Sequence, residues 1–260
     1  MRYVRALARA AALVAFAALH DPLSAGAGGV TFVDYEKATG PGVNGLAGAM
    51  AVALSPNGLN VYTVGRNDDA VSVWDRDPIT NAVTLLEVEE DDVGGVDGMR
   101  DPQGVAVSPD GACVYVATRG NEPGPDGPGT VASFSRNLVT GALTFVSFIE
   151  DDAGVDGIGF AIDVVVSPDN LHVYVIGEGD DAVASFSQAG CVLTQIDNDV
   201  NSIGGVDGMR GPQNVAISPD GLHVYVTARK TIGTATFGTV AVFSRALTGE
   251  LTFVEFQQDG

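Results

Sequence analysis

Four charged residues occupy one position in consecutive repeats of this sequence, directly after a segment rich in valine and tyrosine. They are Arg66, Arg119, Glu178 and Arg229. Guanidinium groups bind carboxylates and phosphates through paired hydrogen bonds. The four residues are therefore candidates for binding a small anionic or carboxylate-bearing ligand. The alternative is that the arginines pair with acidic loop residues, because charged groups at loop entries are usually solvated or paired. The acidic neighbours are Asp68, Asp69, Asp180 and Asp181.

A recurring turn defines the repeats that carry these residues. The phrase Ser-Pro-Asp-Gly begins at residue 108 and returns, with Asn replacing Asp or Gly in places, at residues 55, 167 and 218. Proline presets one backbone dihedral of such a turn, and glycine tolerates a positive φ. The intervals of 53, 59 and 51 residues predict a repeat architecture, because a fixed period of this size is typical of one.

Each repeat predicts four antiparallel strands. In the second repeat they are residues 104–107, 113–118, 130–136 and 143–149, which are rich in β-branched and aromatic residues. Repeated four-stranded meanders form a β-propeller. We therefore expect an all-β fold with blades at about 49–102, 103–160, 161–212 and 213–260, plus one extra strand at 30–36. Trp74 falls in the aromatic column of Phe134, Phe186 and Phe243, so we interpret it as a core residue.

Several repeat motifs resemble those of lactonase-type seven-bladed propellers, also described as YVTN-repeat or 6-phosphogluconolactonase-like proteins. The motifs are the Ser-Pro-Asp-Gly-x-x-Val-Tyr-Val phrase, the Val-Ala-x-Phe-Ser-Arg strand at 131–136 and again at 240–245, and the Thr-Gly-x-Leu-Thr-Phe-Val ending. The resemblance implies about seven blades, with residues 30–36 closing the last. We therefore expect an incomplete ring, the N-terminal portion of a longer propeller. It also implies lactone chemistry at the channel mouth, although no family catalytic motif maps onto this chain.

The N-terminus and the charge balance predict export. Three arginines precede an apolar run over residues 10–19, and Ala-Gly-Ala follows at 25–27, as in a secretory signal peptide. We expect residues 1–27 to be removed and residues 28–260 to form a periplasmic or extracellular propeller domain, with no membrane insertion of the mature chain. The net charge of −20 argues against nucleic acid and anionic membranes as partners.

Two cysteines and two histidines of the mature chain have structural explanations. Cys113 and Cys191 lie in different repeats at non-equivalent positions, so we expect two small apolar core residues, with a disulfide as the less favoured alternative. His172 and His223 occupy the position held elsewhere by Asn60 and Cys113. A position that accepts Asn, Cys or His predicts packing rather than general-base catalysis.

The acidic linkers between repeats allow two interpretations. Asp97, Asp156 and Asp207 each precede a glycine, and we expect them to cap their own turns through side-chain hydrogen bonds. The alternative is that the linker carboxylates bind Ca²⁺, although their spacing does not match an EF-hand. We therefore predict no metal site and no cofactor.

Two functional hypotheses follow. The first is an exported binding or interaction module for a small anionic ligand or a protein partner. It would use its long-loop face, which carries the loops between the second and third strands and the linkers between repeats, because binding sites usually lie on loops held by a rigid scaffold. The second, implied by the resemblance, is a lactonase-like hydrolase or lactonising enzyme acting on a small carboxylate or lactone. Fold alone does not decide between them.

Overall fold

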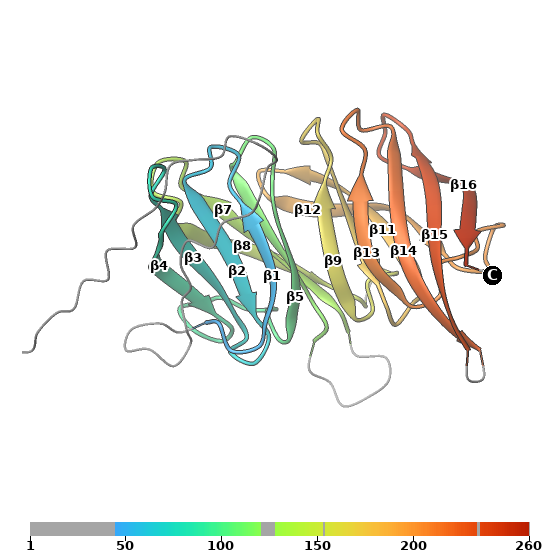
Figure 1. Ribbon diagram of the computed structural model, residues 1–260, viewed down its shortest axis with the longest axis horizontal. Helices are drawn as coiled ribbons and strands as arrows, with labels where there is room; N and C mark the ends of the chain where they lie inside the picture. The colour runs from blue at the N-terminus through green and yellow to red at the C-terminus, as the bar shows by residue number, and fades with distance from the viewer. Residues whose placement is uncertain (1–44, 121–127, 153, 233–234, 260) are drawn as a thin grey trace, which may run out of the picture. The chain divides into compact units, whose positions relative to one another are not determined.

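The computed structural model describes residues 45–120, 128–152, 154–232 and 235–259. In this part of the chain all regular structure is β, in four sheets of four antiparallel strands (Figure 1). This confirms the predicted fold class. The expected signal peptide (1–27) and extra strand (30–36) lie outside the described residues. No helix in the described part has the length and hydrophobicity needed to span a bilayer.

Each sheet is a meander in which sequential strands are neighbours. The first contains β1 (Ala49–Leu54), β2 (Asn60–Gly65), β3 (Ala70–Arg76) and β4 (Val83–Glu90). The second contains β5 (Pro102–Val107), β6 (Cys113–Thr118), β7 (Thr130–Arg136) and β8 (Leu143–Glu150). The third contains β9 (Ala161–Val166), β10 (His172–Gly177), β11 (Ala182–Ala189) and β12 (Val192–Val200). The fourth contains β13 (Pro212–Ile217), β14 (His223–Ile232), β15 (Ala235–Arg245) and β16 (Leu251–Gln258). We call these sheets blades 1 to 4.

The recurring turn joins the first two strands of every blade. In blade 2 the Ser108 hydroxyl donates to Asp110 at 2.6 Å and accepts from the backbone N–H of Cys113 at 2.9 Å. Gly111 has a φ of 73°, which a residue with a side chain rarely adopts. The turn is therefore held by its own side chains and serves to set blade length.

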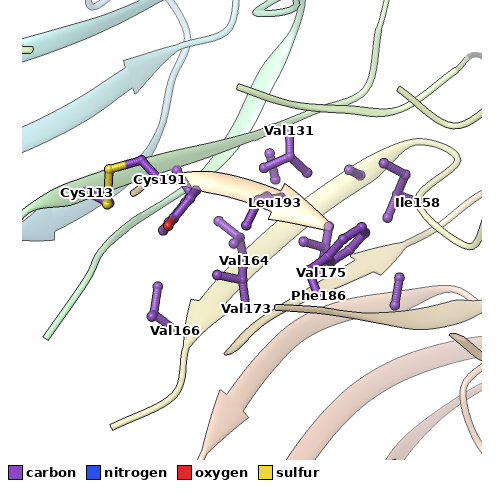
Figure 2. Packing of buried hydrophobic residues seen from close by; sticks show 14 residues of the cluster. Cys113, Val131, Ile158, Val164, Val166, Val173, Val175, Phe186, Cys191 and Leu193 are labelled. Atoms are coloured by element: carbon purple, nitrogen blue, oxygen red, sulfur yellow. A yellow bond between two sulfur atoms is a disulfide. The ribbon is translucent and has the colours of Figure 1, made fainter. Parts of the chain in front are cut away.

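Three hydrophobic cores lie between successive blades. One contains Tyr62, Val71 and Phe134, one contains Tyr115, Val131 and Phe186, and one contains Tyr174, Val183 and Phe243; Figure 2 shows the second of these. All nine side chains are fully buried. Each core combines residues of two neighbouring sheets, so a blade is stabilised by its neighbours rather than by itself. Trp74 is 3% exposed, which confirms its interpretation as a core residue.

Buried arginines connect blades 1 and 2 and blades 3 and 4. Arg245 of β15 donates through Nε to the Tyr174 hydroxyl of β10 at 2.7 Å, and that hydroxyl donates to the Gly249 carbonyl at 2.9 Å. Arg136 and Tyr62 make the same connection, with the Tyr62 hydroxyl donating to the Gly141 carbonyl at 2.8 Å. An arginine at the end of a third strand thus pairs with the tyrosine of the preceding blade. We call this contact the arginine–tyrosine lock.

The interface between blades 2 and 3 uses a disulfide instead. Gln188 replaces the arginine of the lock. The Tyr115 hydroxyl donates to the side-chain oxygen of Gln188 at 3.3 Å. Cys113 and Cys191 are bonded, with their Cα atoms 5.4 Å apart (Figure 2). The expectation of two unpaired cysteines is therefore wrong. Their repeat positions differ because the start of a second strand faces the turn after the third strand of the next blade.

The described blades contact one another in sequence order through their first strands, β1 to β5, β5 to β9 and β9 to β13. Gly104 of β5 lies so close to β9 that a Cβ atom would be 2.8 Å from the Cα of Asp163. Asp163 in turn accepts from the backbone N–H of Val215 of β13 at 3.0 Å. Within the described residues these contacts do not close into a ring (Figure 1).

Candidate functional site

Arg66 follows β2 and reaches the next blade. Its Nε lies 2.9 Å from Oδ1 of Asp101, and its Nη2 lies 3.3 Å from Oδ2 of the same carboxylate. Asp101 immediately precedes β5 and has a φ of 52°. The two-point geometry is typical of an arginine–carboxylate pair. With 44% of the Arg66 side chain exposed, the guanidinium remains accessible beside this ion pair.

Arg119 follows β6 and forms an ion pair with Glu178, which follows β10. Its guanidinium carbon lies 5.9 Å from the ring centroid of Phe160, the residue before β9. The Nε atom of Arg119 is buried and has no hydrogen-bond partner among the described residues. Glu178 also accepts from the side-chain amide of Gln213 at 3.4 Å. One charged pair therefore joins blades 2 and 3 and contacts blade 4, and it retains an unused donor.

Arg229 follows the same pattern in sequence but not in contacts. Its side chain is exposed, and within residues 45–120, 128–152, 154–232 and 235–259 it forms no hydrogen bond or ion pair. The structure thus brings together Arg119 and Glu178 and gives Arg66 a different partner. Each candidate with a partner bridges to the following blade, so the four side chains do not converge on one point.

The four acidic loop residues named as alternative partners of the arginines have other roles. Asp68 and Asp180 accept from the backbone N–H groups of Ala47 and Gly159 at 2.9 and 2.7 Å. Asp69 and Asp181 accept from those of Asp101 and Gly211, at the entrance to the next blade, at 2.8 and 2.6 Å. These carboxylates satisfy backbone donors of the interblade loops. Arg66 and Arg119 are paired instead with Asp101 and Glu178.

Sequence reasoning missed Asp101, Phe160 and Gln213. Asp101 and Phe160 share a repeat position at which every blade has a positive φ, and the other two blades have glycine there. Because Asp, Phe and Gly have no side-chain chemistry in common, the sequence does not mark this position as part of a binding site. Its place opposite the second-strand arginines of the preceding blade follows only from how the blades pack.

A polar pocket of about 180 Å³ lies on the face that carries the interblade linkers. It is formed between the linker that joins blades 1 and 2 and the strands of blade 2. Its lining includes Asp91, Asp97, Arg100, Phe148 and Glu150. Arg100 is already paired with Asp91 at 3.1 Å and with Asp92 at 3.0 Å. The pocket is therefore rich in carboxylates, and an anion would be repelled from it.

The linker carboxylates mostly bind the protein's own backbone. Asp97 and Asp207 accept from the N–H of the following glycine at 2.8 and 2.7 Å, which confirms the capping prediction for both. Asp156 departs from it, because its carboxylate accepts from the Asn198 side chain at 3.1 Å.

Asp156 also lies near Asp151 and Asp180, with one oxygen from each within 4.8 Å of the others. Burial, with the nearby Asp180 charge, raises the pKa of Asp151. Asp151 and Asp180 are held by the backbone N–H groups of Ile158 and Gly159. Each of the three carboxylates thus has a protein partner.

The histidines lie on the opposite end of the blades, beside the recurring turns. His172 is 5% exposed and its Nδ1 is 2.6 Å from Nη2 of Arg245. Burial and the arginine charge lower the pKa of His172. This confirms the prediction that His172 is a packing residue, and the contact with Arg245 shows that it packs between blades 3 and 4.

Comparisons with known proteins agree with this architecture. A family described as "Lactonase, 7-bladed beta-propeller" matches residues 43–153 and 163–260. No curated protein matches the sequence. Among solved structures, a candidate 6-phosphogluconolactonase from Bacteroides uniformis is 21% identical, with a TM-score of 0.58 over 80% of this chain and 57% of that one.

Two further structures show the same fold. A Lactobacillus plantarum protein is 22% identical, with a TM-score of 0.60 over 81% of this chain and 57% of its own. Kuenenia stuttgartiensis hydrazine synthase is 21% identical, with a TM-score of 0.55 over 87% of this chain and 53% of its own. The chain thus spans little more than half the length of these structures. The family match covers most of its sequence, and the chain belongs to the lactonase family of seven-bladed β-propellers.

Proposed function

We propose that this chain is the exported part of a lactonase-type propeller that binds a small carboxylate or lactone beside Arg119. The ion pair of Arg119 with Glu178 across blades 2 and 3 carries the proposal. Within the described part of the chain the Nε atom of Arg119 has no hydrogen-bond partner, and the Phe160 ring lies against its guanidinium. A guanidinium in this setting offers directional hydrogen bonds to a carboxylate or carbonyl oxygen, and Phe160 offers an apolar wall for a carbon ring.

Hydrolysis of a lactone is the second candidate function, and the family assignment favours it. Water would add its oxygen to the carbonyl carbon, the ring C–O bond would break, and the proton lost by water would reach the departing ring oxygen, giving a hydroxy acid. Arg119 is suited to stabilise the negative carbonyl oxygen. Glu178, its ion-pair partner, is suited to carry the proton.

Binding and hydrolysis can be tested separately. We expect gluconate and glucono-δ-lactone to bind, and Arg119→Ala to weaken binding about tenfold or more, since a hydrogen bond to a charged group contributes about 1.5–3 kcal/mol. Calorimetry measures binding, and acid release at constant pH, above the spontaneous rate, measures hydrolysis. Glu178→Gln should retain gluconate binding but lose hydrolysis.

The matched control is Arg100→Ala, which removes a linker arginine already paired with Asp91 and Asp92. It should leave binding unchanged. Gluconate binding that survives Arg119→Ala unchanged would overturn the proposed site. Binding without acid release would leave a binding module and exclude the lactone hydrolase.

Export has independent support from the disulfide. Cys113 and Cys191 are bonded across two blades, and disulfides persist mainly in oxidising compartments. Together with the leader-like residues 1–27, this supports a location of the mature chain in the periplasm or outside the cell. Intact-mass analysis of the secreted protein should give a chain that starts near residue 28. A cytoplasmic chain that retains Met1 would contradict export.

A further inference from the structure

The end of the blades that carries the recurring turns also carries large aliphatic side chains exposed to solvent. The turns between first and second strands and those between third and fourth strands share this end, which lies along the upper edge of Figure 1 and which we call the turn face. Six of its side chains are between 38% and 87% exposed, namely Leu59, Ile79, Val139, Leu171, Leu222 and Leu247. Exposed turns usually carry polar residues instead.

These side chains recur at two fixed positions of the repeat. Three directly precede a second strand, as Leu171 precedes β10, and three lie in the turn after a third strand, as Val139 follows β7. Blades 2 and 3 each have a blade on both sides, and Val139 and Leu171 are still 86% and 54% exposed there. Their exposure is therefore a property of the turn face and does not depend on which blades the chain contains.

Contacts between neighbouring turns join these positions into one surface. The side-chain amide of Asn170 donates to Asp110 at 2.8 Å, which connects the turns of blades 2 and 3. A Cβ atom on Gly111 would lie 3.6 Å from Cδ of Pro56 and 3.7 Å from Cδ2 of Leu138. The turn of blade 1 and the turn after β7 thus lie directly beside the turn of blade 2. A continuous apolar patch, unlike single exposed side chains, is typical of an interaction surface.

The turns also place carboxylates around the aliphatic side chains. Hydrogen bonds from two backbone N–H groups of its own turn lower the pKa of Asp77. Hydrogen bonds from the Ser218 hydroxyl and the Leu222 N–H lower the pKa of Asp220. Both groups therefore stay ionised at neutral pH. The exposed carboxylates of the turn face include Asp77, Asp110, Asp169, Asp220 and Glu250.

The arginines at this end of the described blades offer little free positive charge. Arg136 is 6% exposed and is held in a lock. The side chain of Arg245 is 4% exposed and is held in the other lock. Arg76 is half-buried and donates to the Gly58 carbonyl and to Asn81. The turn face therefore presents aliphatic and acidic groups to solvent.

We propose that the turn face docks a basic amphipathic segment of another protein, one that combines large aliphatic side chains with lysine or arginine. The aliphatic side chains of the segment cover those of the turn face, and its cations lie against the surrounding carboxylates. Removal of apolar surface from water supplies the affinity, and the charges select the partner. The net charge of −20 opposes two other occupants, a second copy of this chain and an anionic membrane.

The test uses the full chain, with an amphipathic helical peptide of leucine and lysine as the probe. We expect the peptide to bind and the double variant Val139→Ser, Leu171→Ser to bind it about tenfold more weakly, as measured by calorimetry. The matched control is Val93→Ser, Ile203→Ser, which removes two side chains that are 55% and 63% exposed in the interblade linkers of the opposite face. The control should bind as the parent does. Because all four positions are exposed, both variants should fold, and circular dichroism checks this.

Several results would overturn the proposal. One is a parent chain that does not bind the leucine–lysine peptide. Another is equal affinity of the two double variants, because the peptide would then bind only through the overall negative charge. A peptide of leucine and glutamate that binds equally well would remove the argument from charge. Sedimentation and binding to phosphatidylcholine vesicles test the other occupants. Self-association or vesicle binding that is lost in Val139→Ser, Leu171→Ser would assign the turn face to a second copy or to a lipid surface.

Discussion

Asp199 of β12 is a carboxylate placed where ionisation is unfavourable. Burial, with the neighbouring charge of Asp197, raises the pKa of Asp199 to about 6. Its Oδ2 atom is buried without a hydrogen-bond partner among the described residues. The folded protein therefore holds a proton on Asp199 more tightly than the unfolded chain does. The contribution of Asp199 to the free energy of unfolding is therefore greatest below the ordinary pKa of aspartate, and it decreases as the pH rises toward 6.

We expect Asp199→Asn to remove this pH dependence. The variant should melt at a higher temperature than the parent at pH 7, and the difference should shrink as the pH falls toward 4, where Asp199 of the folded protein is protonated and uncharged. Thermal unfolding followed at several pH values measures it. Asp75→Asn, on an exposed strand position, is the control and should show no such trend. An equal difference at pH 4 and pH 7 would contradict the assignment.

At the scale of elements, the disulfide joins blades 2 and 3 across 78 residues. Closing a loop of this length removes entropy from the unfolded chain worth about 4.5 kcal/mol in the chain-entropy treatment. Replacing both cysteines by serine should lower the free energy of unfolding by about 2–5 kcal/mol. Urea unfolding measures the loss.

The reduced parent protein is the matched comparison for the serine variant and should unfold at a similar urea concentration. An oxidised parent no more stable than the serine variant would show that the bond contributes nothing. The slope of the unfolding curve is compared too, because a change there would reflect the unfolded state rather than the interface.

The strands could be predicted because their signals are local. Residues 113–118 and 130–136 agree with β6 and β7 at both ends, since alternation and the flanking turns fix them within a few residues. Pairing between blades could not be predicted in the same way. Cys191 lies in a turn whose equivalents are Gly141 and Gly249, and only the packed blades show that this turn faces the start of the preceding second strand.

The candidate site was predictable in part for the same reason. Arg66, Arg119 and Glu178 share a repeat position, so their common location after the second strand followed from sequence. The contacts of the two arginines with Asp101 and Phe160 could not be predicted from the sequence. These two residues lie in the next blade, at a position where the backbone needs a positive φ. A shared repeat position predicts a shared height on the propeller, but not convergence on one ligand.

For the whole molecule, the net charge of −20 implies repulsion within the folded state. Salt screens such repulsion over about 10 Å at 0.1 M. We therefore expect the melting temperature at pH 7 to rise with sodium chloride between low salt and about 0.5 M, measured by calorimetry. Near the sequence pI of about 4.1 the same series should be nearly flat. A melting temperature at pH 7 that falls with salt would show that ion pairs outweigh repulsion.

The different chemistry of the three interfaces bears on how the blades find their correct order. Nearly identical repeats can dock on the wrong neighbour during folding, a known hazard of repeat proteins. Blades 1 and 2, and blades 3 and 4, share one kind of contact, but Cys113 can bond only with Cys191 among the cysteines of the chain. The bond forms only after blade 3 has been synthesised and has met blade 2. The disulfide therefore forms only in chains whose second and third repeats have packed side by side in the correct order, and it then holds them in that order.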